Sequence, residues 1–419
     1  MGSLSLYLVF DIIKRIYNKE AAVFTLFALT INPWSIMVSR WALDCNLFPA
    51  VFLLGFFFLI RYLSDSKKWM LWISFFIFGL SLYAYGTTYF FVPVFILAAL
   101  IYLLIKKKVE FTSIIIPSFI FFITALPIAL FLIINKLKLP SIETAFFSIP
   151  RLSGTARYDT VASFFSPHFF KTSWHNFQNF LKMFFLTQQD GRPWNSFQDI
   201  GFMYLFSLPF LVAGFYKNIK ERNSLNFLFI IWTVTALFLV FTMDPNINRS
   251  NIIFFPAIIF IGLGIYELKN KSNIFLRSTL VVYIAFFLFF SFQYFTKYPK
   301  TSSEAFMESL GTAIKYAKKT VSPDETIYIT HSHINMPYIF VLFYGKENPW
   351  IFNNTVKYYN PGQEFQWVRS FDRYNFGERR DSSTFQGNIY ILHNSEGSYF
   401  KNPNFKVKRF KNFSVAVRK

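Results

Sequence analysis

The chain has 419 residues, of which 54% are hydrophobic and only 15% are charged, and its net charge at pH 7 is +20. Soluble domains average about 25% charged residues, and here the apolar residues gather in long runs, so a soluble globular protein is excluded. The basic residues gather in the short loops between these runs, which favours a membrane protein over a nucleic-acid-binding one. With Cys45 as the single cysteine, an intrachain disulfide is also excluded.

Apolar runs of roughly 17–25 residues are typical of membrane-spanning helices, and the sequence predicts ten of them. Charged residues interrupt the first run, and the second is broken near Pro33, because proline disrupts a helix interior. The predicted segments are 3–17, 20–38, 47–63, 69–84, 88–105, 112–134, 201–216, 225–242, 251–266 and 275–295. We therefore expect a mostly α fold, a polytopic bundle of about ten transmembrane helices.

Lys and Arg are distributed unequally between alternate loops of this bundle. Five loops, at 14–19, 61–68, 106–108, 217–222 and 269–277, hold three basic residues each, fifteen in total. The opposite short loops hold two, Arg40 and Arg249. Because cytoplasmic loops carry the excess of Lys and Arg, we expect the fifteen on the cytoplasmic side of a cell membrane. Loop 135–200 and the tail are then extracytoplasmic, and so is Met1, which suggests that a further helix precedes it.

Two segments are too polar to span a membrane. In loop 135–200, the stretch Phe169–Leu186 alternates apolar and polar residues at near-helical spacing, which predicts an amphipathic helix on the outer membrane face. In the tail, we expect helices over 302–319 and 336–344 and strands at Thr326–Thr330, Asn388–Leu392 and Phe405–Val417. These predict a small external α/β domain, 299–419, after a transmembrane domain, 1–298. No glycine-rich phosphate loop is present, and no His/Cys cluster has metal-ligand spacing.

Arg40 and Asp44 lie between the second and third predicted helices. They are four residues apart, so on one helix they would share a face. We interpret them as a pair at the outer mouth of a cavity, with Arg40 near a phosphate and Asp44 orienting a sugar or an ion. The competing interpretation is a carboxylate at a helix start and an arginine whose head group reaches water.

Arg249 is the one basic residue of its loop, just before the apolar run that begins at Ile252. A guanidinium matches phosphate oxygens bidentately, so Arg249 is a candidate for binding an outer-leaflet lipid phosphate. We expect Arg249→Ala to abolish activity and leave folding intact. An interfacial anchor is the competing role.

A second group of candidates comes from two turns. The stretch Asp190-Gly191-Arg192-Pro193-Trp194-Asn195-Ser196 combines a carboxylate, a guanidinium, an indole and an amide, a mixture that sugar sites use. An ordinary capped turn before the next helix is the alternative. Tyr85 lies in a tight external turn, where it either faces the cavity or belongs to an interfacial belt of aromatic residues. The candidate substrate-binding residues are therefore Arg249, Tyr85, Asp190, Arg192, Trp194 and Asn195.

Four stretches carry a resemblance: INPWSIMVSRWALDCNLFP, LYAYGTTYFFVP, DGRPWNS with GFMYLFSLP, and INRSNIIFFPAIIFIGLG. They resemble the bacterial membrane glycosyltransferases of family 39, which have the GT-C fold and are related to protein O-mannosyltransferases and lipid A aminoarabinose transferases. The resemblance covers roughly 1–295. It implies that a polyprenyl-phosphate sugar enters from the outer leaflet, and that the lipid phosphate leaves with inversion. Arg40 and Asp44 match the family's Arg and acidic residue at a helix start, and Arg249 matches its phosphate-facing basic residue.

The resemblance also implies a carboxylate base in a first external loop, and that loop and its helix would precede Met1. The main general base is therefore expected upstream, and the sequence leaves open whether the chain as given is active. We predict a hexosyl or pentosyl glycosyltransferase that moves a sugar from a polyprenyl-phosphate donor to a glycan, lipid or protein. The competing interpretation is a non-catalytic membrane protein, either a transporter or flippase of lipid-linked glycans or an inactive partner subunit. No cofactor is indicated with certainty, and a divalent metal ion stays open.

Overall fold

The protein is described here from a computed structural model, which covers residues 2–154, 168–195, 197, 199–221, 223–363, 365–377, 387–396 and 402–419. Ser196, part of the turn singled out above, lies outside these residues. The described chain forms two compact units. The helical unit holds residues up to 298 except 151–154, and the sheet unit holds 151–154 together with the residues from Pro299 onward.

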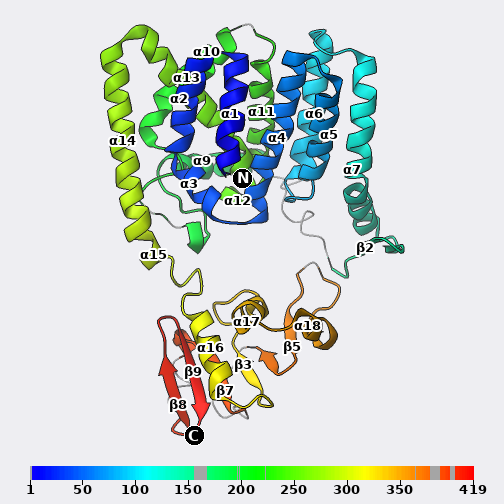
Figure 1. The fold of residues 1–419 in the computed structure, drawn as a ribbon, viewed down its shortest axis with the longest axis vertical. Coiled ribbons are helices and arrows are strands. Elements are labelled where there is room, and N and C mark those ends of the chain that lie inside the picture. Colours follow the sequence, from blue (N-terminus) through cyan, green and yellow to red (C-terminus); the bar gives the residue numbers. More distant parts are fainter. Residues whose placement is uncertain are drawn as a thin grey trace. The chain divides into compact units, whose positions relative to one another are not determined.

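Each of the ten apolar runs corresponds to a helix or a helix pair of the helical unit (Figure 1). These are α1 (Gly2–Ile16), α2 (Lys19–Thr30) with α3 (Pro33–Arg40), α4 (Asp44–Asp65), α5 (Lys68–Ser81), α6 (Thr88–Ile105), α7 (Phe111–Leu137), α10 (Leu208–Lys220), α11 (Phe227–Thr242), α13 (Phe254–Lys271) and α14 (Asn273–Thr296). Within the described residues, five spans are long and apolar enough to cross a membrane, or six if the bent pair α2–α3 counts as one. The prediction of a mostly helical membrane fold is confirmed.

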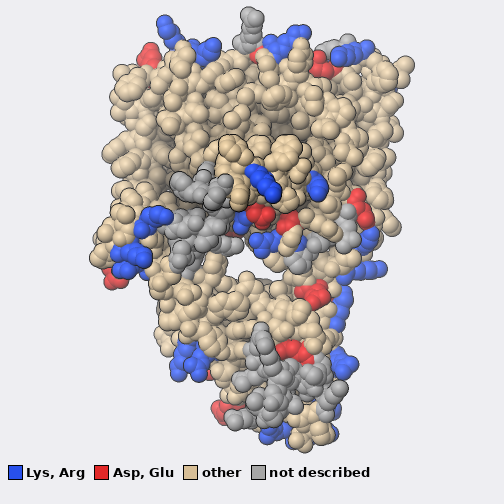
Figure 2. Space-filling view, turned by 180° about the vertical axis from the view of Figure 1, so that it is seen from behind, with Lys and Arg blue, Asp and Glu red and all other residues tan. Residues whose placement is uncertain are grey.

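Charged side chains avoid the middle of this unit. Figure 2 shows a broad band across it without Lys, Arg, Asp or Glu, and charged residues at both ends of the band. The predicted basic loops share one end, because Arg15 at the end of α1 pairs with Asp65 at the end of α4 (2.8 Å). At the same end, Lys217 of α10 pairs with Glu267 of α13 (2.5 Å). The loops therefore alternate between two ends as the charge pattern predicts.

The second predicted run is bent by 62° between α2 and α3. Pro33 occupies the first turn of α3, and the Asn32 side chain caps the helix by accepting a hydrogen bond from the Ser35 N–H (3.3 Å). A break inside an apolar environment must have its backbone groups satisfied by other parts of the protein. The Tyr204 hydroxyl donates to the Ile31 carbonyl (2.9 Å) and the Trp34 N–H donates to the Phe202 carbonyl (3.2 Å). The predicted break is confirmed, and residues 202–204 complete it.

The predicted helix 201–216 begins later than expected, with a 3-10 turn, η2 (Leu205–Ser207), before α10. Pro209 favours a helix start because its missing N–H costs nothing in the first turn. The preceding segment is instead held between α9 (Phe169–Phe185) and the α2–α3 break: the Met203 N–H donates to the Phe184 carbonyl (2.7 Å). A Cβ at Gly201 would overlap the backbone of Phe185, so this close approach needs glycine.

Helix α9 confirms the predicted amphipathic helix. Its inner face packs on α11, where the Asn176 side chain donates to the Phe241 carbonyl (3.2 Å) and the Phe177 ring stacks on the Phe241 ring (5.0 Å). Phe170 and Trp174, one turn apart, are exposed at the edge of this face, and the polar residues of the helix are exposed on the opposite side. Exposed aromatic residues beside a separate polar face are typical of an interfacial helix.

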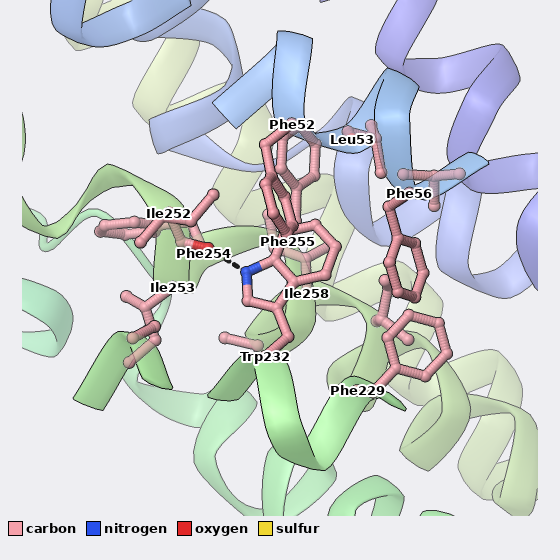
Figure 3. Packing of buried hydrophobic residues seen from close by; sticks show 14 of the residues in the cluster. Phe52, Leu53, Phe56, Phe229, Trp232, Ile252, Ile253, Phe254, Phe255 and Ile258 are labelled. Carbon is pink, nitrogen blue, oxygen red and sulfur yellow. Dashed lines mark hydrogen bonds between the residues drawn. The ribbon is translucent and has the colours of Figure 1, made fainter. Parts of the chain in front are cut away.

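The buried centre of the unit is aromatic (Figure 3). Trp232 of α11 is fully buried between Phe52 and Phe56 of α4, with ring centroids 4.7 and 5.1 Å away. Its indole N–H donates to the carbonyl of Ile252 (2.8 Å), which satisfies the buried donor. This bond ties η3 (Asn251–Ile253), which follows the short helix α12 (Ile247–Ser250), to the core.

The sheet unit is an α/β layer built on one seven-stranded sheet, with strand order β4-β5-β6-β3-β7-β9-β8. Strand β3 pairs in parallel with β6 and β7, and the other pairs are antiparallel. Its elements are α16 (Leu310–Thr320), β3 (Ile327–Ile329), α17 (Pro337–Gly345), α18 (Pro349–Thr355), β4 (Lys357–Tyr358), β5 (Val368–Phe371), β6 (Tyr374–Phe376), β7 (Ile389–His393), β8 (Phe405–Arg409) and β9 (Phe413–Arg418). The expected helix 302–319 begins only at Leu310, and β4, β5, β6 and α18 were not predicted.

Short elements complete the description. A hairpin, β1 (Ile142–Glu143) and β2 (Ser148–Ile149), follows α7, and η1 (Pro193–Asn195) lies in the turn after α9. The four-residue helix α15 (Tyr298–Thr301) follows α14.

Candidate functional site

A pocket of about 450 Å³ opens at the end of the helical unit opposite the basic loops. Its walls come from the start of α1, from α3, from the connection to α4, from the first turns of α4, and from Phe255 of α13. The lining residues are Gly2, Ser5, Trp34, Ser35, Val38, Ser39, Arg40, Trp41, Ala42, Leu43, Asp44, Asn46, Leu47, Pro49, Ala50 and Phe255. The volume is within the range of small-molecule sites, so the bend between α2 and α3 and the α3–α4 connection together frame a binding cavity.

Arg40 and Asp44 both line this pocket, but they do not share a helix face as the spacing predicted. Helix α3 ends at Arg40 and α4 begins at Asp44, with Trp41 and Leu43 extended between them. The Arg40 guanidinium lies over the rings of Tyr294 and Phe295 of α14, at 5.3 and 4.8 Å from their centroids. The connection between α3 and α4 therefore brings Arg40 and Asp44 to the same pocket, and the two side chains make different contacts.

Asp44 occupies the first position of α4 and is exposed. One of its carboxylate oxygens accepts a hydrogen bond from the Cys45 N–H (2.7 Å). A negative charge at a helix N-terminus is favourable because the unpaired N–H groups there carry partial positive charge. Asp44 thus stabilises α4 and also lines the pocket, and its functional interpretation stays a prediction.

A buried hydrogen-bond network fixes the floor of the pocket. Asn251 of η3 accepts from the Trp34 indole N–H (2.8 Å) and donates to the Asn46 side-chain oxygen (2.9 Å). Asn46 in turn donates to the Trp41 carbonyl (2.9 Å). Since Asn251 and Trp34 are 1% and 2% exposed, the Trp34 indole N–H would lose its buried acceptor without Asn251. Sequence analysis missed this network, although all four residues lie inside the stretches INPWSIMVSRWALDCN and INRSN.

The pocket has the chemistry of a site for a sugar or a phosphate. Trp34 is held flat against Phe254 (4.9 Å between centroids), and Trp41 lies in the opposite wall region between α3 and α4. The hydroxyl groups of Ser35 and Ser39, one turn apart on α3, also line it. Aromatic faces, hydroxyls, one carboxylate and one guanidinium thus surround the same space.

Arg249 is placed just behind this pocket, two residues before Asn251, but it does not line it. The Asn246 side chain caps the four-residue α12 by accepting from the Arg249 N–H (3.1 Å). The guanidinium contacts Asp244, donating to its carbonyl (2.9 Å) and lying 3.6 Å from its carboxylate. A role of Arg249 in binding phosphate therefore stays a prediction.

The turn that contains Asp190 supports the site from outside. The Asp190 carboxylate accepts from the N–H of Ile247 (2.9 Å), from the Asn195 side chain (3.0 Å) and from the N–H of Arg192 (3.1 Å). Burial raises the pKa of Asp190 above its ordinary value, against the opposing effect of these hydrogen bonds. Asp190 and Asn195 thus hold the turn against α12, and the structure gives them a positioning role.

Trp194 and Arg192 connect the same turn to the pocket wall. The Trp194 ring packs edge-on against the ring of Trp41 (6.0 Å), and the Arg192 guanidinium lies 6.0 Å from the Trp194 ring. The Tyr298 hydroxyl donates to the Trp194 carbonyl. Trp194 therefore contacts a residue that lines the pocket and lies outside the lining itself.

The comparisons with known proteins agree with this architecture. Residues 1–140, a third of the chain, match the family described as dolichyl-phosphate-mannose-protein mannosyltransferase. The crystal structure of ArnT from Cupriavidus metallidurans bound to undecaprenyl phosphate superposes with a TM-score of 0.51 at 11% identity, covering 99% of this chain and 82% of that one. The apo state of the same protein gives a TM-score of 0.50 at 11% identity, covering 99% and 81%. The chain has the GT-C fold.

A weaker likeness is to the apo oligosaccharyltransferase of Archaeoglobus fulgidus, with a TM-score of 0.42, 13% identity, and coverage of 95% of this chain and 58% of that one. No curated protein matches the chain. The GT-C fold thus rests on the likeness to ArnT.

Tyr85 is the last of the substrate-binding residues that the sequence predicted. It lies in the turn between α5 and α6, where its carbonyl accepts from the Thr88 hydroxyl (2.6 Å). Tyr85 is partly exposed and is not part of the pocket lining. Both interpretations of Tyr85, the interfacial belt and a contact with substrate, stay predictions.

The described residues also bring together one group with metal-ligating atoms, in the sheet unit. Glu304, His333 and His393 each offer one ligand atom, and these atoms lie within 4.8 Å of one another. Sequence spacing gave no sign of this group, because its members come from three separate segments.

Proposed function

We propose that this protein is an integral-membrane glycosyltransferase that moves a hexosyl or pentosyl unit from a polyprenyl-phosphate donor to an acceptor at the outer face of the cell membrane. The observation that carries the proposal is the pocket that Arg40 and Asp44 line together with Trp34 and Trp41. The GT-C fold, the solved ArnT complex with undecaprenyl phosphate and the family match over residues 1–140 support the same donor class.

Arg40 is the cation of the pocket, and we assign it to the donor phosphate. As the glycosidic bond breaks, negative charge grows on the leaving phosphate, and a guanidinium placed beforehand stabilises it without a proton transfer. The rings of Tyr294 and Phe295 hold that guanidinium in place at the end of α14. Inversion at the sugar carbon follows if the acceptor attacks from the side opposite this phosphate.

Asp44 is the carboxylate of the pocket, and we assign it to orient the sugar or the acceptor hydroxyl. Trp41, which is half-buried, is the indole of the lining on which we expect a sugar ring to stack, whereas Trp34 is buried against Phe254. If a divalent ion takes part, as the sequence analysis allows, Asp44 is the carboxylate of the pocket that would bind it. The sugar and the acceptor are not assigned.

The orientation of the protein is part of this proposal. Cytoplasmic loops carry the excess of Lys and Arg, and the five basic loops lie at the end of the helical unit opposite the pocket. We therefore place the pocket, loop 135–200 and the sheet unit, as a separate domain, on the extracytoplasmic side.

The experiment is a transfer assay on the purified chain in nanodiscs with polyprenyl-phosphate sugars labelled in the sugar, combined with native mass spectrometry of undecaprenyl phosphate binding. Wild type should bind the lipid phosphate and release it from the donor, whereas Asp44→Asn should bind and not transfer. Glu20→Gln, which removes a charge at the opposite end of the unit, is the matched control. If the wild type and Asp44→Asn both move the lipid between leaflets without releasing sugar, the flippase interpretation holds and ours is contradicted.

Arg249 is tested in the same assay. Loss of transfer by a well-expressed Arg249→Ala protein, with wild-type thermal unfolding, would support a contact with the lipid phosphate. Normal transfer would assign Arg249 to its pairing with Asp244.

A further inference from the structure

Three polar side chains converge at one edge of the sheet unit, far from the pocket in sequence. His393 is the last residue of β7, His333 lies in the loop between β3 and α17, and Glu304 lies in the turns that precede α16. Strands β3 and β7 are adjacent and parallel, so the segments that follow them leave the sheet at the same edge. The carboxyl ends of parallel strands are a common place for ligands to bind, because loops from neighbouring strands meet there.

The separations of the ligand atoms suit one small cation. Oε1 of Glu304 lies 3.2 Å from Nδ1 of His333 and 3.7 Å from Nε2 of His393. A tetrahedral zinc site with bonds of about 2.0–2.1 Å holds its ligand atoms about 3.3 Å apart. The three atoms therefore need only small side-chain movements to contact a common ion.

The His393 ring is oriented by its neighbour Ser395. Nδ1 of His393 accepts a hydrogen bond from the Ser395 N–H (3.2 Å) and lies 2.7 Å from the Ser395 hydroxyl, so the opposite nitrogen, Nε2, faces Glu304. A metal-bound His393 would carry its proton on Nδ1 and donate it to the Ser395 hydroxyl, since metal-ligating histidines usually donate from the second ring nitrogen. The His333 ring lies against the His393 ring, with centroids 4.3 Å apart.

The backbone of His333 adds an independent sign. Its φ is 58°, in the left-handed region that residues other than glycine seldom adopt. Such conformations are strained and gather at ligand sites, where the surrounding structure enforces them. Here the strained residue is the one whose side chain completes the group.

We infer that Glu304, His333 and His393 form a binding site for a divalent transition-metal ion of the zinc class, with water at the open position. Imidazole nitrogens select zinc, copper, nickel or iron over magnesium and calcium, which take oxygen ligands. Glu304 and His333 are half-exposed (59% and 51%) and His393 is buried (8%), so the ion would be reached from solvent. The ion clamps the segment before α16 to the ends of two central strands, and the site is separate from the proposed transfer pocket.

The test is calorimetric titration of the full chain in detergent, without a histidine tag and after chelator treatment, with ZnCl2 and then with MgCl2. We expect one zinc ion per chain, no heat with magnesium, a rise in the unfolding temperature with zinc, and a four-coordinate visible spectrum when Co²⁺ replaces zinc. Glu304→Gln and His333→Asn should each weaken zinc binding about tenfold or more. Asn tolerates the left-handed backbone, so the second variant removes the ligand without adding strain.

Two controls make the result decisive. Glu308→Gln removes a carboxylate from the same segment, where it pairs with Lys411 (2.7 Å), and His175→Gln removes an exposed histidine of α9. Both should bind zinc as wild type does. No zinc binding, or binding that Glu304→Gln and His333→Asn leave unchanged, would overturn the inference, and neither result bears on transfer at the pocket.

Discussion

Two groups of charged residues in the helical unit differ in their pairing: those at the ends of α1 and α4, and the two that line the pocket. At one end, Arg15 lies between Asp11 (2.7 Å) and Asp65 (2.8 Å), and Arg61 pairs with Asp65 as well (3.2 Å). At the pocket end, no ion pair within the described residues joins Arg40 or Asp44 to an opposite charge, although the two line the same cavity. Arg40 rests on aromatic rings instead.

The difference separates charges that hold the fold from charges that are available to a ligand. Arg15, Arg61 and Asp65 are partly buried, and their pairing joins α1 to α4. Arg40 and Asp44 are exposed, so a ligand can reach both charges without breaking an ion pair. We propose that such a ligand supplies an anion to Arg40 and hydroxyl groups to Asp44.

The largest expected effect is at the pocket. Replacing Arg40 by alanine should lower the transfer rate about 100-fold or more, because a donor aimed at developing charge is lost. Arg40→Lys should recover part of the rate, since it keeps the charge but not the forked geometry. Initial rates with labelled donor measure both. Unaltered transfer by Arg40→Ala would remove the contrast between the two ends.

A second effect is expected at Asn251, which joins the pocket floor to η3. Asn251→Ala leaves the Trp34 indole and the Asn46 side chain without their buried partner, which costs about 1–3 kcal/mol. We expect a lower unfolding temperature and a raised KM, because Trp34 is no longer fixed in the lining. Thermal unfolding and donor titration measure the two, and a change in stability with an unchanged KM would show that the network does not shape the pocket.

At the paired end, Asp65→Asn should reduce stability by about 1–2 kcal/mol, because two arginines lose a shared partner at about one-quarter exposure. Transfer per folded molecule should stay as in wild type. Denaturation in detergent and the rate per folded protein test this. A rate loss as large as that of Arg40→Ala would mean that the paired charges also serve catalysis.

The smallest expected effect depends on pH, through Asp190. Burial raises the pKa of Asp190 in the folded protein above its ordinary value near 3.8. The folded state therefore binds this proton more tightly than the unfolded state, and stability falls as pH rises from the ordinary value through the raised one. Asp190→Asn should lack that pH-dependent loss. Unfolding temperatures of both proteins from about pH 4 to pH 7 measure the difference, and parallel curves would contradict the sign.

Much of the helical unit could be predicted because membrane-spanning helices require long apolar runs, and because Lys and Arg are concentrated in the loops on one side. The break at Pro33 was visible for the same local reason. The loop that contains Arg40 was predicted as well, between the segments 20–38 and 47–63. The bond that shapes it, from the Asn46 side chain to the Trp41 carbonyl, was not predicted, because the sequence does not show which backbone group a side chain binds.

Three other features were not predicted because local sequence carries little sign of them. Residues 201–204 are apolar enough for a helix, yet their backbone groups bind the α2–α3 break and α9. Strands β4 to β6 have two to four residues each, too few for an alternating pattern to register. Glu304, His333 and His393 meet only because β3 and β7 are neighbours, which no local spacing encodes.

The segment that completes the α2–α3 break has a mechanical consequence. The Met203 N–H is bonded to the end of α9, and the Phe202 carbonyl and the Tyr204 hydroxyl are bonded to the break beside the pocket. Helix α9 presents Phe170 and Trp174 outward, as an interfacial helix does. Residues 202–204 thus join the end of α9 to the bend between α2 and α3 beside the pocket by one continuous set of hydrogen bonds.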